Sequence, residues 1–480
     1  MDVSPMEPSV LDKIFEPRRI AVIGTSRDRG FFWVRCFLEI GFSGEIFPVN
    51  PKEKEVLGLR CYPSVRDIPC EIDFSVIAIP APKVPDVLRD SAEKGAKLAT
   101  IFSSGFSETG TREGIELERK IRNIVEEYGI RVLGPNCMGV YIPSRGLSFR
   151  PDFPKESGTV GFISQSGGNA IGVVLYGESW GVRFSKVFSY GNGVDLECTE
   201  LLEYLGWDPE TEVVGIYVEG VRDGKKFLSV ARRIAQEKPL VVWKGGVTSA
   251  GSKAAASHTG ALAGSAEIWN AVLKQCNAVA VSSMDEMVDM LKVFTQVPEI
   301  RGRRISLISI SGGASVVNTD LAEKGGFVVE EFPQDLQEKF RSKIQPVGVS
   351  VRNPIDLAGS FYDYEALEYI MEEIKPLIDV LVFDLQIIYP ILWRRMREFD
   401  YLSTLTKLVI EGCKSYRDDD KVFVVILPVM HYEREWIDVK NKLIAEGVPV
   451  FQSTDRAINA LAKAYRYYRR LEKLKGNVAR

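Results

Sequence analysis

The sequence predicts an α/β protein made of three doubly wound domains, each built on a parallel sheet. Short apolar, β-branched runs alternate with amphipathic stretches along the 480 residues, which is typical of βαβ units. One device recurs three times, a strand followed by a Gly/Ser turn and a helix, at Gly24, at 164–168 and at 311–313. The length supports several domains, because a chain of this size exceeds what one hydrophobic core holds. We therefore expect a ligand site at the carboxyl end of the first strand of each domain.

The first domain is expected over residues 1–150. Its predicted strands cover residues 20–24, 44–50, 73–80, 98–105 and 131–136. Its predicted helices cover residues 29–39, 84–95 and 114–129. The strand runs are apolar throughout, which favours strands that are buried on both faces of a sheet.

The second and third domains are expected over residues 158–295 and 303–480, after two linkers. The first linker, 148–158, contains two prolines and a closing glycine, and the second covers 295–304. The predicted strands of the second domain are 159–164, 185–191, 213–219 and 239–246, with helices at 167–181 and 284–294. The predicted strands of the third domain are 305–313, 325–332, 379–387, 421–427 and 448–451, with a closing helix from about Thr454.

Composition excludes several classes of protein. The chain has 61 basic and 65 acidic residues, a net charge of −4, and no Lys/Arg tract, so no nucleic-acid surface is expected. The N-terminus lacks the pattern of a secretory signal, and no apolar segment is long enough to span a bilayer. The seven cysteines are scattered without C-x-x-C spacing, which argues against a disulfide framework or structural zinc. We therefore expect a cytoplasmic protein with reduced thiols.

The chain has only two histidines, His258 and His431. Multi-histidine metal sites are therefore excluded, and we expect no metal site in this chain. No G-x-S-x-G elbow is present to supply the serine of a hydrolase triad. His431 is interpreted as a structural residue at a strand exit.

The first Gly/Ser turn, "AVIGTSRDRG", is similar to a dinucleotide-type phosphate turn but lacks the full G-x-G-x-x-G pattern. Enzymes that bind NAD place an Asp or Glu after the second strand, where this chain has Asn50 and Lys52. A lysine there suits a phosphorylated ribose, as in coenzyme A or NADP, better than a free diol. A strand-exit turn with a solvated lysine is the alternative interpretation.

The second turn, "GFISQSGGNAIGV", ends a strand and opens a helix at residues 164–168. Helix starts present free backbone N–H groups and favour anions, serines add donors, and glycines allow close approach. This pattern predicts a phosphate site. The alternative is a serine N-cap followed by a tightly packed glycine pair.

His258 lies in "AASHTGALAG", a run of small residues that gives it no bulky packing partners. A neutral imidazole is a competent nucleophile toward a phosphoryl group, and a carboxylate commonly orients its other ring nitrogen. Glu219 is the candidate carboxylate, because it ends an otherwise apolar strand where an unpaired charge is costly. The alternatives are an ordinary loop with an incidental histidine and a solvated carboxylate at the end of a strand.

Together these residues resemble a known family, the alpha subunit of ADP-forming acetate–CoA ligase, which is similar to the succinyl-CoA synthetase alpha chain. The motifs that carry the resemblance are "SHTGALAGS", "ISQSGGNAIG", "YVEG", "GPNCMGV", "LDKIFEPRRIAVIG", "FPVNPK" and "CYPSV". The resemblance implies a Rossmann-like CoA-binding domain, a flavodoxin-like phosphohistidine domain and a third flavodoxin-like domain. It also implies the reaction acyl-CoA + ADP + phosphate ⇌ carboxylic acid + ATP + CoA, through an acyl phosphate and a phosphohistidine.

The resemblance assigns roles to individual residues. It implies that His258 is phosphorylated and that Glu219 orients it. The implied phosphate-binding residues are Ser164, Ser166, Gly167, Gly168 and Gly260. The implied CoA-binding residues are Gly24, Thr25, Ser26, Arg27, Asn50, Lys52, Tyr62, Pro80, Ser104, Gly105, Phe106 and Asn136.

The chain lacks an ADP site of its own in the sequence, since it has no G-x-x-x-x-G-K-[ST] motif and no spare length for an ATP-grasp domain. The resemblance implies that a separate ATP-grasp beta subunit binds ADP or ATP with Mg²⁺. An α2β2 heterotetramer is therefore expected.

One departure from the family leaves other functions open. Phe31, Phe32 and Trp33 stand where the family has a small-residue helix start, and they are expected to crowd the CoA pyrophosphate or to pack on the adenine. A regulatory chain that binds acyl-CoA without turnover is one alternative, although such a chain needs no nucleophile. An NADP-dependent oxidoreductase is the other. The sequence leaves open which acid is activated, in which direction, and whether ADP or GDP is used.

Overall fold

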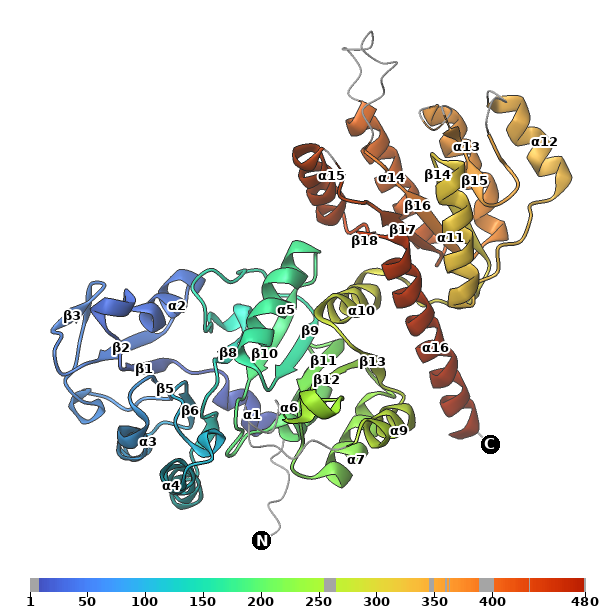
Figure 1. Cartoon of the computed structure of the whole chain (residues 1–480). Coiled ribbons are helices and arrows are strands. Elements are labelled where there is room, and N and C mark those ends of the chain that lie inside the picture. Colours follow the sequence, from blue (N-terminus) through green and yellow to red (C-terminus); the bar gives the residue numbers. More distant parts are fainter. Residues whose placement is uncertain are drawn as a thin grey trace. The chain divides into compact units, whose positions relative to one another are not determined.

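The computed structural model describes residues 8–253, 265–344, 349–358, 361, 363–387, 401–430 and 432–478. These residues form two compact units, 1–287 and 288–480, each described here by itself. Among the described residues, the first unit contains two large sheets and a small two-stranded one, and the second unit contains one sheet (Figure 1). None of the helices in these described ranges is both long and apolar enough to cross a membrane.

The first sheet has five parallel strands in the order β2-β1-β5-β6-β7. Its strands are β1 (Arg19–Ile23), β2 (Glu45–Val49), β5 (Phe74–Ile77), β6 (Leu98–Ile101) and β7 (Arg131–Leu133). The helices of this part are α1 (Pro8–Ile14), α2 (Phe32–Ile40), α3 (Val84–Glu93) and α4 (Arg112–Tyr128), with a small hairpin of β3 (Glu55–Val56) and β4 (Leu59–Arg60). In Figure 1, α2 lies on one face of the sheet and α3 and α4 lie on the other, which is the doubly wound arrangement.

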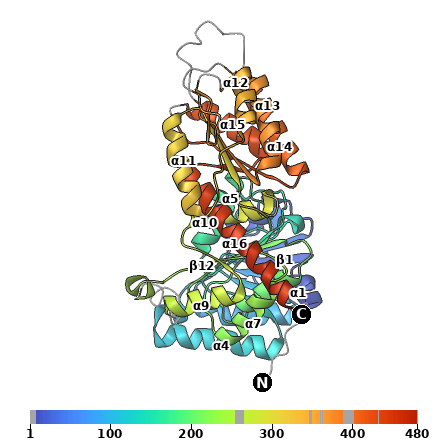
Figure 2. The ribbon, with the colours of Figure 1, turned by 90° about the vertical axis from the view of Figure 1, so that its right-hand side faces the viewer.

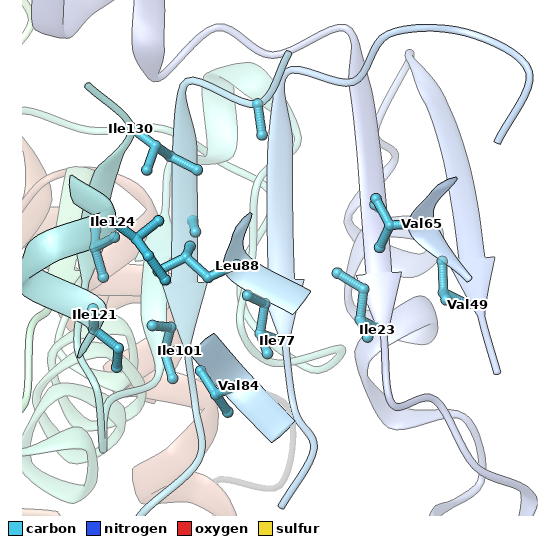
Figure 3. Close-up of a cluster of buried hydrophobic side chains, with 14 of the residues drawn as sticks. Ile23, Val49, Val65, Ile77, Val84, Leu88, Ile101, Ile121, Ile124 and Ile130 are labelled. Carbon is cyan, nitrogen blue, oxygen red and sulfur yellow. The ribbon is translucent and has the colours of Figure 1, made fainter. Parts of the chain in front are cut away.

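The core of this domain lies between the sheet and its helices α3 and α4 (Figure 3). Ile23, Ile77 and Ile101 project from neighbouring strands, and Leu88 and Ile121 meet them from the two helices. The strands are mainly apolar, with Ser75 and Thr100 as buried polar exceptions, because their other face is also covered, in this case by α2. This packing holds the carboxyl ends of β1 and β5 side by side.

The second sheet has six strands in the order β13-β12-β11-β9-β10-β8. Its strands are β8 (Gly139–Tyr141), β9 (Val160–Ser164), β10 (Phe184–Ser189), β11 (Val213–Val218), β12 (Leu240–Lys244) and β13 (Val279–Val281). Its helices are α5 (Gly167–Ser179), α6 (Cys198–Trp207), α7 (Gly224–Ile234) and α9 (Ala266–Cys276), and the boundary between the two units falls within α10 (Met284–Gln296). All pairs are parallel except the edge strand β8, which precedes the expected linker and pairs antiparallel with β10.

The third sheet, in the second unit, has five parallel strands in the order β15-β14-β16-β17-β18. Its strands are β14 (Ile305–Ser309), β15 (Ile355–Asp356), β16 (Val380–Asp384), β17 (Val422–Ile426) and β18 (Val450–Phe451). Its helices are α11 (Gly312–Gly325), α12 (Gln334–Lys343), α13 (Tyr364–Ile374), α14 (Tyr401–Asp418), α15 (Glu433–Ala445) and α16 (Thr454–Val478). Figure 2 shows α11 on one side of this sheet and α13 and α14 on the other. The fold class is thus confirmed as α/β with three mainly parallel sheets, a Rossmann-like domain followed by flavodoxin-like domains.

One predicted strand, residues 325–332, is wrong. Only Val328 forms a β-bridge, with Arg304, and the position beside β14 is taken by the short strand β15. Beyond that bridge the segment bonds elsewhere, since the Asn353 side-chain amide donates to the Glu330 carbonyl at 2.9 Å. Only Phe327 and Phe332 of this segment are buried, and its backbone pairs with the start of β14 at Val328 alone, so the apolar pattern marked two anchoring side chains and not a strand.

The predicted helix at residues 29–39 begins later than expected. Gly30 and Phe31 have left-handed backbone conformations, with φ of 57° and 54°, and they separate a short 3-10 turn from α2. A positive φ at a bulky residue such as Phe31 is unusual and ends regular helix geometry.

Candidate functional site

The candidate site of the second sheet lies at its topological switch point. From β9 the chain moves outward to β10 and then returns to β11 on the other side of β9. The Cα partners Ser164–Tyr217 and Val218–Lys244 align the carboxyl ends of β9, β11 and β12 at one edge. Ligands of doubly wound proteins bind at this place.

The predicted phosphate turn, residues 164–168, connects β9 to α5. The Ser164 hydroxyl is buried and donates to the Ser166 carbonyl at 2.6 Å, and Ser166 Oγ caps α5 by accepting from the Asn169 amide at 3.3 Å. The two serines therefore shape the turn. The helix start leaves its first amides without intrahelical partners, which is the feature that attracts anions.

The two glycines of this turn have different surroundings. A Cβ added to Gly167 would lie 2.7 Å from Met138 Cγ, so this glycine is required by packing. A Cβ on Gly168 would meet only Ser166 Oγ, at 3.9 Å. The tight-packing interpretation therefore holds for Gly167, whereas the backbone at Gly168 is open to an approaching group.

Gln165 joins the ends of three strands. Its side-chain oxygen accepts from the amides of Glu219 and Gly220, at 2.8 and 3.3 Å, and from the Tyr190 hydroxyl at 3.3 Å. Gln165 and Tyr190 are both buried. The turn after β9 is thereby tied to the residue that follows β11.

Glu219 is buried, with 6% of its surface exposed, so the alternative of a solvated carboxylate is wrong. The Tyr217 hydroxyl donates to Glu219 Oε1 at 3.1 Å. Burial and the adjacent Glu219 carboxylate raise the pKa of Tyr217, which keeps its hydroxyl protonated as a donor. A Cβ on Gly245 would lie 2.6 Å from Tyr217 Oη and 3.3 Å from Glu219 Cγ, so only a glycine leaves room for this pair.

Lys244, the last residue of β12, brings a positive charge to the same edge. Its ammonium is buried, donates to the Gly245 carbonyl, and lies 5.4 Å from the centroid of the Trp269 ring. Burial lowers the pKa of Lys244, and the Glu219 carboxylate partly offsets that effect. Among the described residues Lys244 has no ion-pair partner within 4.0 Å, unlike the buried lysines 186 and 292.

The predicted nucleophile His258 and the predicted phosphate residue Gly260 lie outside the described residues, as does His431. Their roles stay predictions. The described chain stops at residue 253, after β12, and resumes at Ser265, which caps α9 by accepting from the Ile268 amide at 3.2 Å.

The candidate site of the first sheet is also at a switch point, between β1 and β5. Gly24 has a φ of 89°, and a Cβ there would lie 2.3 Å from the Ala78 carbonyl oxygen after β5. Thr25 is 2% exposed, and its hydroxyl has no hydrogen-bond partner within the described chain. A buried hydroxyl without a partner is costly, so this atom suits a ligand that supplies one.

The polar residues beside this turn divide into structural and exposed groups. The Asn50 side chain donates to the Thr25 carbonyl and accepts from the Lys52 amide at 2.8 Å, so it braces the turn. The Lys52 ammonium is exposed, and Arg27 pairs with Glu53 at 3.2 Å. The set of donors and cations suits a phosphorylated ligand.

The remaining predicted CoA residues lie after β2, β5, β6 and β7. Tyr62 is buried and bonds to Asn50 through its backbone, while Pro80 and Ser104 are exposed. Ser26 caps the 3-10 turn by position but without a side-chain hydrogen bond. These residues share the carboxyl edge of the sheet.

Three predicted CoA residues make structural contacts. Phe106 is fully buried in the core, and the amides of Gly105 and Phe106 donate to the Glu108 carboxylate, at 2.7 and 3.2 Å. Asn136 lies 3.5 Å from the Asn192 side chain, which in turn donates to Glu108 at 2.6 Å. This part of the edge therefore connects the first sheet to the turn after β10.

The aromatic departure at residues 31–33 packs mainly within the protein. Trp33 is buried, with its ring centroid 4.8 Å from that of Phe102 and 5.2 Å from that of Phe32. Phe31 is half-buried, and the Arg27 guanidinium lies 5.9 Å from its ring centroid. Trp33 thus belongs to the core behind α2, and only Phe31 adjoins the turn.

The third turn, residues 311–313, is framed by carboxylates. A Cβ on Gly312 would lie 2.8 Å from Asp356 Oδ2, and Asp384 is buried at the end of β16, where burial raises its pKa. Its side chain accepts from Gln386 at 2.8 Å. The three turns share their topology but differ in charge.

Sequence reasoning missed Gln165, Tyr217 and Lys244. Tyr217 had a signal, because it stands two residues before Glu219 and so shares its face of the strand. Lys244 ends an apolar strand in the same way as Glu219. Gln165 had no such signal in the sequence, because its role depends on which strands are neighbours in the sheet. No group of three or more His, Cys, Asp or Glu side chains suited to a metal occurs in the described parts of the chain.

Known proteins match this chain over most of its length. Residues 18–143 match the CoA binding domain family, and residues 157–294 match the succinyl-CoA ligase like flavodoxin domain family. Acetate–CoA ligase [ADP-forming] II of Archaeoglobus fulgidus is 36% identical over 476 residues, which cover 96% of this chain and 67% of that protein. Acetate–CoA ligase [ADP-forming] II subunit alpha of Pyrococcus furiosus is 36% identical over 378 residues, which cover 78% of this chain and 82% of that subunit.

A solved structure shares the fold. It is the dinucleotide forming acetyl-coenzyme A synthetase 1 of Ca. Korarchaeum cryptofilum, in complex with phosphate and ADP, with a TM-score of 0.82 and 32% identity. The match covers 97% of this chain and 98% of that chain. This chain spans about two thirds of the first A. fulgidus relative (67%) and about half of two others (51% and 49%). The chain therefore belongs to the family of ADP-forming acyl-CoA ligases, as an alpha-subunit-like member with a CoA-binding domain and a succinyl-CoA ligase-like domain.

Proposed function

We propose that this chain is the alpha subunit of an ADP-forming acyl-CoA synthetase that works through a phosphohistidine at His258. The overall reaction is acyl-CoA + ADP + phosphate ⇌ carboxylic acid + ATP + CoA. The observation that carries this proposal is the buried Glu219 carboxylate, which Gln165 ties to the phosphate-type turn at the start of α5. A carboxylate and an anion-binding helix start at one sheet edge are what a phosphorylated histidine needs.

The first domain would bind CoA as a substrate. The unpartnered Thr25 hydroxyl and the exposed Lys52 ammonium would serve its phosphates, and Gly24 allows the close approach. Asn50 would act indirectly, since its side chain holds the turn in shape. The residues present therefore fit a phosphorylated ligand at the carboxyl edge of β1.

The second domain would carry the group transfer. The start of α5 would hold inorganic phosphate, and a phosphate oxygen would attack the carbonyl carbon of the thioester. The C–S bond would then break, which releases CoA as the thiol and leaves an acyl phosphate in the site. A ring nitrogen of His258 would attack the phosphorus, the P–O bond to the acyl group breaks, and the carboxylate leaves. Glu219 would accept a hydrogen bond from the other ring nitrogen, and the phosphoryl group would then pass to ADP.

A second chain would complete the enzyme. Relatives named as alpha subunits and the longer single-chain relatives both support an ATP-grasp beta subunit that binds ADP or ATP with Mg²⁺. An α2β2 assembly is the form we propose. The acyl group stays open, because relatives are named for acetate, 4-hydroxybutyrate and trans-ferulate.

The test is acid-labile phosphate on this chain. The chain would be combined with its ATP-grasp partner and γ-labelled ATP, and the label located by peptide mapping. Label on the peptide that contains His258, absent from His258→Ala and retained in His431→Ala, would support the proposal. CoA binding without label in the wild-type complex would contradict it and favour the acyl-CoA-binding regulatory chain.

A further inference from the structure

We propose that Tyr217 is a positioning residue that fixes the Glu219 carboxylate for its work on the nucleophile. This inference rests on the proposed function and deepens it, because it assigns a residue that acts through Glu219. The family resemblance assigns no role to Tyr217. The evidence for this role is the hydrogen bond of 3.1 Å that the Tyr217 hydroxyl donates to Glu219 Oε1.

The hydrogen bond from Tyr217 engages one particular oxygen of the Glu219 carboxylate, Oε1. Tyr217 and Glu219 stand two residues apart at the end of β11 and so lie on the same face of the sheet. The phenol stays protonated and donates to Glu219, because burial and the neighbouring negative charge raise the pKa of Tyr217. With Oε1 held, rotation of the carboxylate is restricted, and the second oxygen keeps a fixed direction.

The residues around Tyr217 and Glu219 hold the tyrosine in position and leave room for the pair. The Tyr217 ring packs edge-on against Trp243 of β12, with centroids 4.9 Å apart, which sets the position of the hydroxyl. Gly245 lies against both members of the pair, and a Cβ there would come within 2.6 Å of the hydroxyl. A site that keeps a glycine to accommodate one tyrosine–glutamate pair has the geometry of a preorganised site.

The backbone of Glu219 is held as firmly as its side chain. Gln165 accepts from the Glu219 amide at 2.8 Å, so the carboxylate is fixed at both ends of the residue. The Lys244 ammonium, on the next strand, adds a favourable charge without a direct ion pair. Tyr217 therefore bonds directly to the carboxylate, whereas Gln165 bonds to the backbone of the same residue.

The test compares two tyrosines of this domain in the complex of the full chain with its partner. Tyr217→Phe removes the hydroxyl that faces Glu219. Tyr176→Phe is the matched control, because its hydroxyl also donates to a carboxylate, that of Asp285, at 2.6 Å on another part of the domain. We expect Tyr217→Phe to lower kcat about tenfold to a hundredfold, the range that loss of a charge-assisted hydrogen bond implies. The KM values for phosphate and CoA are expected to stay within twofold, and the control to keep the wild-type kcat.

A double variant separates positioning from general damage. If Tyr217 acts through Glu219, adding Tyr217→Phe to Glu219→Gln lowers kcat no further, whereas independent effects multiply. A kcat for Tyr217→Phe within twofold of wild type, a loss confined to KM, or multiplicative losses in the double variant would each overturn the inference.

Failure of the positioning role of Tyr217 can be told apart from failure of the proposed function. If the wild-type complex forms no phosphohistidine, the proposed function fails, and a crystal structure of Tyr217→Phe decides the positioning by itself. A Glu219 carboxylate displaced by about 1 Å or more would support the inference, since such a shift is large for a reacting group. A carboxylate that stays in place would overturn it.

Discussion

Replacement of Gln165 by leucine tests the connection between the phosphate-type turn and Glu219. The side-chain oxygen of Gln165 accepts from two backbone amides, of Glu219 and Gly220, and from the buried Tyr190 hydroxyl. Leucine fills a similar volume and accepts none of these bonds. All three donors would then lose this acceptor, and two of them, the Glu219 amide and the Tyr190 hydroxyl, belong to buried residues.

The expected loss of stability follows from the number of donors that lose their acceptor. A buried donor without a partner costs about 1–3 kcal/mol, and the weakest value for each of the two buried donors gives a loss of about 2 kcal/mol in the free energy of unfolding. Glu219 would also lose the bond that fixes its backbone, so we expect kcat to fall together with stability.

The assay is urea unfolding of the isolated chain, followed by tryptophan fluorescence, with Gln334→Leu as the control. Gln334 is exposed and its recorded side-chain bond is to Glu338, at 3.2 Å, so the control is expected to change stability by less than about 0.5 kcal/mol. A loss below about 1 kcal/mol in Gln165→Leu would refute the reasoning, since it would mean that other acceptors replace the glutamine oxygen.

Three further variants have defined outcomes. Gly245→Ala is expected to displace the Tyr217 hydroxyl, because the new Cβ would lie 2.6 Å from it, and to lower kcat at unchanged CoA affinity by calorimetry; an unaltered kcat would contradict the crowding. Thr25→Val removes a buried hydroxyl without a partner, so we expect weaker CoA binding with unfolding stability equal to or above wild type, and a stability loss would show that the hydroxyl has a protein partner. Lys292→Met removes an amine whose pKa burial lowers to about 8. The unfolded chain binds this proton more tightly than the folded chain, so below pH 8 the charge costs the wild type about 3 kcal/mol, and this cost disappears as pH rises from about 8 to 10. The stability of Lys292→Met relative to wild type should therefore shrink across that range, and a flat difference would contradict the sign.

The strand–turn–helix device was enough to predict the fold class and the edge at which the sites lie. Gly24 follows the first strand of its sheet, the turn at 164–168 follows the first parallel strand of the second sheet, and the topology places both at switch points. This works because a parallel sheet fixes where its carboxyl ends meet, whatever the order of the strands. Glu219 was also predictable, because a charged residue after an apolar strand requires a partner.

The sequence did not predict which strands lie next to each other in a sheet. Gln165 matters because β11 lies beside β9, and β8 joins the second sheet although it comes before the expected linker. The predicted strand at 325–332 has the right composition, but the place beside β14 belongs to the short strand β15. Composition indicates burial, whereas pairing is decided by competition among segments that are far apart in the chain.

The same competition explains why several predicted CoA residues have structural duties. Polar groups that follow buried strands need partners whether or not a ligand is present. Asn50 meets this need within its own turn, and the amides of Gly105 and Phe106 meet it through Glu108. The Thr25 hydroxyl does not, which makes it the more informative residue for ligand binding.

The arrangement around Glu219 also bears on whether the chain catalyses or only senses acyl-CoA. Burial of a carboxylate costs free energy unless hydrogen bonds offset it, and this chain commits Gln165, Tyr217 and the space at Gly245 to that purpose. A CoA sensor would need the first domain alone, where Gly24 and Thr25 lie, and would have no use for a buried carboxylate in the second domain. Retention of a buried, doubly fixed carboxylate at the second switch point therefore favours the enzyme, and Glu219→Leu offers the direct comparison: we expect a chain that binds CoA as before and no longer carries phosphate.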